Sequence, residues 1–98
     1  MYQSLRDTCS VWPAEPVDNS FSKPINSAIP TLLLSGALDT VTPPGWAHKA
    51  MPEMSNARHF VSPYASHGLA MQTCANRLVA DLIDQGSVQE LDDIAKSI

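Results

Sequence analysis

The sequence predicts a mixed α/β fold built on a parallel sheet, and three features support this prediction. A short apolar run, Thr31–Ser35, is closed by Gly36, which is typical of a strand buried on both faces. A second run, Arg58–Val61, has the composition of a strand and ends at Pro63. The stretch between the two runs has the features of a helix. Two strands joined through a helix pair in parallel, with a right-handed crossover.

Three helices are expected in this α/β segment. Thr42 is predicted to cap a helix whose first turn holds the two prolines that follow it. The spacing of apolar residues predicts a second helix over residues 74–83, with Gly86 as its C-terminal stop. The Ser87–Glu90 pair has the spacing of a capping box and predicts a last short helix through Leu91, Ile94, Ala95 and Ile98.

The chain divides into two parts. Residues 1–29 are expected to form an irregular, Pro-rich connecting arm, in which residues 2–10 could be the end of a helix. Trp12 is expected to anchor this arm by burying its ring. Residues 30–98 are expected to form the α/β segment. Because two parallel strands alone do not make a stable sheet, this segment is expected to complete a larger sheet whose other strands are absent from it.

Composition excludes several classes of protein. Among 98 residues, 44% are hydrophobic and 16% are charged, with a net charge of -4, which is typical of a globular protein. The six Lys and Arg residues are scattered, so nucleic acid is not an expected partner. No apolar run approaches the roughly 20 residues that span a bilayer, so no membrane span is expected.

The cysteines and histidines do not have the spacing of a metal or redox motif. Cys9 and Cys74 lie far apart in the sequence, and they are either a long-range disulfide or two unrelated thiols. A disulfide would stabilise the fold by about 4 kcal/mol and would favour a periplasmic or secreted protein; localisation is otherwise not indicated. His48 and His59 lie on a predicted helix and strand without a nearby carboxylate-rich group, so no metal or other cofactor is expected.

Two polar residues follow the ends of the two predicted strands. Asp39 comes just after the first strand, and His67 occupies the equivalent place after the second. Open α/β sheets carry their functional groups at the carboxyl edge of the strands, so the two side chains are expected to meet. A carboxylate beside a histidine fixes which ring nitrogen carries the proton and stabilises the imidazolium ion that forms when the ring takes a second proton.

A family resemblance is carried by these same segments. The stretch Ile29–Pro44 resembles the acid-bearing strand and turn of peptidase-like α/β-hydrolases, above all the TAP-like C-terminal domain of the tripeptidyl and prolyl aminopeptidase group. Residues 56–59, 66–68 and 78–83 are similar to the histidine strand and final helix of that family, and Cys9, Trp12, Pro13 and Cys74 extend the resemblance over nearly the whole chain.

The resemblance implies that Asp39 is the acid and His67 the base of a catalytic triad. The expected protein is a serine hydrolase, of peptidase, aminopeptidase or esterase type, acting on a small peptide or ester. No Gly-x-Ser-x-Gly occurs, and neither Ser35 nor Ser66 has the small neighbours that a nucleophile elbow requires. The nucleophile is therefore expected upstream, and the isolated chain is expected to be inactive.

Two other classes of protein compete with this reading. One is a non-catalytic binding or assembly module derived from an α/β-hydrolase, and the other is a small redox or metal protein using the cysteines and histidines. A Gly-x-Ser-x-Gly after a strand, upstream in the same reading frame, would favour the enzyme over the module.

Overall fold

The structure, a computed structural model, describes residues 1–72 and 74–96. It confirms a mixed α/β fold, consistent with part of an α/β-hydrolase. The elements, in chain order, are α1 (Tyr2–Val11), η1 (Asn19–Ser22), β1 (Thr31–Gly36), α2 (Pro44–Ala50), β2 (Ala57–Ser62), α3 (Leu69–Gln72), α4 (Asn76–Gln85) and α5 (Asp92–Ala95).

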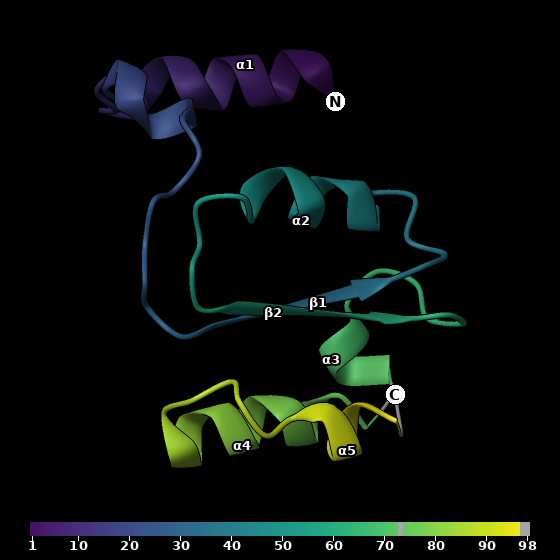
Figure 1. Ribbon diagram of the computed structural model, residues 1–98. Coiled ribbons are helices and arrows are strands. Elements are labelled where there is room, and N and C mark those ends of the chain that lie inside the picture. The colour runs from purple at the N-terminus through teal and green to yellow at the C-terminus, as the bar shows by residue number, and fades with distance from the viewer. Residues whose placement is uncertain (73, 97–98) are drawn as a thin grey trace.

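The two strands form a parallel sheet, as the sequence predicts. Their register pairs Thr31 with Ala57 at one end and Gly36 with Ser62 at the other. The connection between them runs through α2, which is the crossover helix. Because the register keeps both strands level, the segments that follow Gly36 and Ser62 leave the sheet at the same edge (Figure 1).

Helices cover both faces of this sheet. Figure 1 shows α2 over one face, and α3, α4 and α5 over the other. Alternate side chains of a strand point to opposite faces, so Leu32 and Leu34 lie together on the side of α4. There they pack, with Phe60, against a buried cluster formed by Leu78, Val88 and Leu91. This cluster packs both strands against the C-terminal helices.

The two C-terminal helices begin later in the chain than the sequence predicts. The helix predicted over residues 74–83 starts at Asn76, and it ends as predicted at Gly86, whose φ of 62° lies in the left-handed region. The predicted capping box is wrong, because the Ser87 hydroxyl accepts from the backbone N–H of Gln89 at 3.2 Å, and α5 begins only at Asp92. Ile98 lies outside the described residues.

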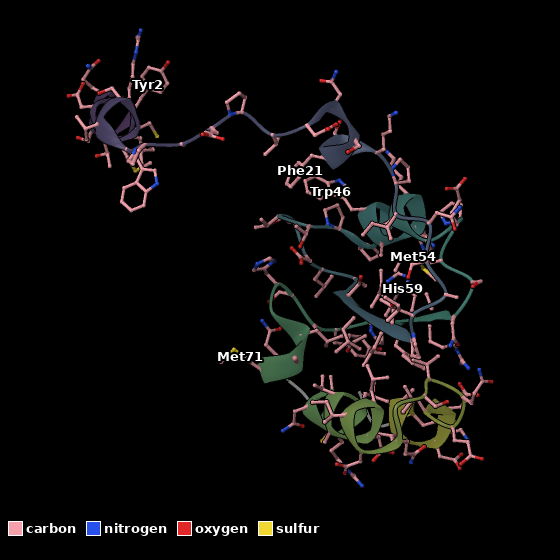
Figure 2. The ribbon with its side chains drawn as sticks, turned by 90° about the vertical axis from the view of Figure 1, so that its left-hand side faces the viewer. Tyr2, Phe21, Trp46, Met54, His59 and Met71 are labelled. Carbon is pink, nitrogen blue, oxygen red and sulfur yellow. The ribbon has the colours of Figure 1, made fainter. Side chains whose placement is uncertain are left out.

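The N-terminal arm is exposed along residues 1–26. Residues 2–10 are helical, as expected, within α1. The predicted anchoring by Trp12 is wrong, because this residue is 71% exposed. The physical reason is that α1 stands apart from the sheet on an extended connection, where the described part of the chain offers no apolar surface to cover the ring (Figure 2). None of the described helices is long and apolar enough to cross a membrane.

Candidate active site

The loops that follow β1 and β2 are joined by backbone hydrogen bonds. The N–H of Ala37 donates to the carbonyl of Ser62 at 2.9 Å, and the N–H of Leu38 donates to the carbonyl of Ala65 at 3.0 Å. These bonds continue the pairing of the strands beyond the sheet. They hold the segment that carries Asp39 against the segment that carries His67.

Gly36 allows this close approach. A Cβ atom at this position would lie 2.4 Å from the carbonyl oxygen of Ala65 and 2.4 Å from that of Ser66. Both contacts are with backbone atoms, which cannot move aside as the end of a flexible side chain can. Only glycine therefore fits where the loop after β2 crosses the end of β1.

Asp39 and His67 are in direct contact. Nδ1 of His67 lies 3.0 Å from Oδ2 of Asp39. The Asp39 residue is 7% exposed, whereas the His67 side chain is 61% exposed. Among the hydrogen bonds that the described residues make, those of the His67 ring are formed by Nδ1, and Nε2 takes part in none of them.

Four donors surround the Asp39 carboxylate. Oδ1 accepts from the backbone N–H of Val41 at 2.8 Å and from that of Thr42 at 2.9 Å, and Oδ2 accepts from the Thr42 hydroxyl at 2.9 Å as well as from His67. Burial raises the pKa of the Asp39 carboxyl, but the hydrogen bonds from Thr42, His67 and Val41 outweigh burial and hold this pKa well below its ordinary value of 3.8. Asp39 is therefore ionised throughout the neutral range.

Because Asp39 is ionised, it can only accept hydrogen bonds. The proton shared with His67 must then sit on Nδ1, which donates to Oδ2. This leaves Nε2 as the ring nitrogen that carries a lone pair. The arrangement can take a proton at Nε2 and stabilise the resulting imidazolium through the carboxylate on the other side of the ring.

The role predicted for Thr42 is wrong. The residue was expected to cap α2, but the N-cap of α2 is Pro43 and no side chain caps this helix. The physical reason is the direction of the Thr42 side chain, whose hydroxyl donates to Oδ2 of Asp39 and lies 3.2 Å from Nδ1 of His67. A hydrogen bond to a charged acceptor is stronger than one from a neutral helix N–H, so the side chain is held at Asp39.

Gln72, the last residue of α3, forms hydrogen bonds with Ser66 and His67 in the loop that follows β2, here called the histidine loop. Its Oε1 accepts from the Ser66 backbone N–H at 2.9 Å and from the Ser66 hydroxyl at 3.2 Å, while its Nε2 donates to the carbonyl of His67. The sequence reading did not identify this residue. The only signal was a polar side chain one turn into the segment after Gly68, which is too general to indicate such a role.

A shallow pocket of about 380 Å³ lies beside the pair. The polar residues of its lining are Asp39, Thr42 and His67. Its apolar residues come from strand β1 and helix α3. The lining residues are Leu34, Gly36, Asp39, Thr42, His67, Gly68, Leu69, Ala70 and Met71. The pocket gives the exposed side of the histidine ring a partly apolar surrounding.

The other two histidines lie elsewhere. Nε2 of His59 is 2.7 Å from the hydroxyl of the buried Ser35, and its ring packs edge-on against that of His48 on α2, with centroids 4.9 Å apart. Burial, together with the charge of His48, lowers the pKa of His59. The described residues contain no group of three or more His, Cys, Asp or Glu side chains that could hold a metal ion.

The two cysteines are not bonded to each other in the structure. Cys9 on α1 and Cys74 before α4 are both exposed free thiols. The long-range disulfide stays a prediction.

The parallel sheet, the crossover helix and the placement of Asp39 and His67 at one sheet edge define a part of an α/β-hydrolase. A family model described as "TAP-like protein" matches residues 1–95. The chain belongs to this TAP-like family, whose model represents a C-terminal domain of α/β-hydrolases. No curated protein and no solved structure matches the chain.

Proposed function

We propose that Asp39 and His67 are the acid and the base of a Ser–His–Asp triad in a serine hydrolase that acts on small peptides or esters. The observation that carries this proposal is the 3.0 Å contact between Nδ1 of His67 and the buried carboxylate of Asp39. The low pKa of Asp39 supports it, since the acid of a triad must stay ionised while its histidine takes up a proton.

In this mechanism, Nε2 of His67 removes the proton from a serine hydroxyl as the serine oxygen attacks the substrate carbonyl carbon. The imidazolium ion is stabilised by Asp39. His67 then gives the proton to the leaving amine or alcohol when the bond between it and the carbonyl carbon breaks. A water molecule, activated in the same way, hydrolyses the acyl-enzyme.

The nucleophile is proposed to lie outside residues 1–98. Ser35 is buried and its hydroxyl bonds to His59, while Ser66 bonds to Gln72 through both its N–H and its hydroxyl. The hydroxyls of Ser35 and Ser66 therefore have structural partners. Residues 30–98 are proposed to be the catalytic segment and residues 1–29 its connecting arm.

Labelling with a fluorophosphonate tests this assignment, because the reagent reacts covalently with an activated serine. In the full-length protein we expect one labelled serine, within a Gly-x-Ser-x-Gly outside residues 1–98, and loss of the label in His67→Ala. The His48→Ala variant is the matched control and should label normally. Labelling of a serine within residues 1–98 would contradict the proposal, and a full-length protein without any label would favour a non-catalytic module.

A further inference from the structure

Thr42 lies where the acid and the histidine of the proposed triad meet. Its hydroxyl oxygen is 2.9 Å from Oδ2 of Asp39 and 3.2 Å from Nδ1 of His67, and its backbone N–H is 2.9 Å from Oδ1 of Asp39. The residue thus contacts both oxygens of the carboxylate and the ring nitrogen that faces it. We propose that Thr42 is a positioning residue that locks the carboxylate of Asp39 and the tautomer of His67. This inference rests on the proposed function.

Three atoms meet at this junction: Oδ2 of Asp39, the hydroxyl oxygen of Thr42 and Nδ1 of His67. They share two hydrogens. Oδ2 of the ionised carboxylate has none to give, and the Thr42 hydroxyl has one, which it donates to Oδ2. The second must therefore come from Nδ1 of His67. Its proton faces Oδ2 and also meets a lone pair of the Thr42 oxygen, so both neighbours of Nδ1 accept.

The opposite tautomer is disfavoured by the same geometry. In the tautomer protonated on Nε2, the unprotonated Nδ1 would place its lone pair against the negative Oδ2 at 3.0 Å. The Thr42 hydroxyl could turn toward Nδ1 to relieve this, but Oδ2 would then lose a hydrogen bond in a buried setting, which is costly. Thr42 therefore adds to the preference for the tautomer whose Nε2 is free to act as a base.

Positioning by hydrogen bonds matters here because packing does little to hold the ring. The His67 side chain is 61% exposed, and the fixed point in its surroundings is the Asp39 carboxylate. The backbone N–H groups of Val41 and Thr42 hold Oδ1, so the hydroxyl of Thr42, which lies beside Nδ1 of the ring, is the second side-chain donor that holds Oδ2. Without it, Oδ2 would keep His67 as its one side-chain donor.

The test is to measure the pKa of Asp39 and the His67 tautomer by ¹³C and ¹⁵N NMR in the full-length protein. The variants are Thr42→Val, which removes the hydroxyl at similar volume, and Thr42→Ser, which keeps it. In Thr42→Val we expect the proton affinity of Asp39 to rise roughly 10- to 100-fold and the population of the Nδ1–H tautomer to fall, because one hydrogen bond to a charge is lost. Thr42→Ser should restore both, and the exposed Thr40→Val should change neither.

A purely structural role would lower the unfolding midpoint and leave both NMR readouts unchanged, and that result would overturn the inference. A Thr42→Ser variant that behaves like Thr42→Val would also overturn it. If Thr42→Val does not fold, Thr42→Ala carries the same expectation with less steric demand. None of these readouts needs the nucleophile, so they separate failure of this inference from failure of the proposed function, which the fluorophosphonate test reveals.

Discussion

Replacing Asp39 by asparagine is expected to lower kcat of the proposed full-length hydrolase about 10⁴-fold, with little change in KM. The side chain keeps its size, but it loses the charge that stabilises the imidazolium ion. The amide also presents a donor to Nδ1 of His67, which favours the wrong tautomer, and a loss of this size is typical when a triad acid becomes an amide. Steady-state kinetics on an ester substrate measure this effect.

The matched control is Asp84→Asn on the exposed side of α4, which removes the same charge far from the pair. Its kcat should remain within about twofold of the unmodified protein, since isolated surface charges have small effects. A similar kcat in the two variants would show that Asp39 acts only through the net charge of the protein or not at all.

Changing Gly36 to alanine disrupts both the fold and the site. The added Cβ would lie 2.4 Å from two backbone carbonyl oxygens, so the loop after β2 must move away from the end of β1. We expect a loss of about 3 kcal/mol or more in the free energy of unfolding, at the upper end of overpacking effects. We also expect a loss of at least about 100-fold in kcat, because a displacement near 1 Å is enough to misplace a catalytic group.

Gly45→Ala is the matched control for this substitution. Gly45 lies in the first turn of α2, and a Cβ there would have no neighbour within 4 Å. Alanine should leave the stability unchanged or raise it by up to about 1 kcal/mol, since it is the better helix former. Urea unfolding of both variants compares the two effects, and equal stability of Gly36→Ala and Gly45→Ala would show that the loops do not depend on the close approach.

The fold could be predicted where short stretches of sequence carry strong local signals. The apolar run of β1, the strand at Arg58–Val61 and the stop at Gly86 all lie where expected. Their connection through one helix is enough to predict a parallel pair. The meeting of Asp39 and His67 also followed from this topology, because the carboxyl ends of parallel strands share one edge.

What could not be predicted depends on contacts between distant segments. The Thr42 side chain has two alternative directions, over the start of a helix or toward Asp39, and only the folded loops decide between them. Gln72 reaches the histidine loop because α3 places it there, and the sequence did not predict this short helix. Trp12 has a large apolar ring that could anchor the arm. Whether the ring packs against an apolar surface depends on the path of the arm, and in the structure Trp12 is exposed.

Asp39 and His67 are proposed to act as one unit. A double-mutant cycle in the full-length protein tests this coupling, with kcat measured for Asp39→Asn, for His67→Ala and for the double variant. Members of a triad are strongly non-additive, because the carboxylate acts only through the histidine. We expect the double variant to be no slower than His67→Ala alone. Losses that multiply, so that the double variant is slower by a further factor of about 10⁴, would contradict it.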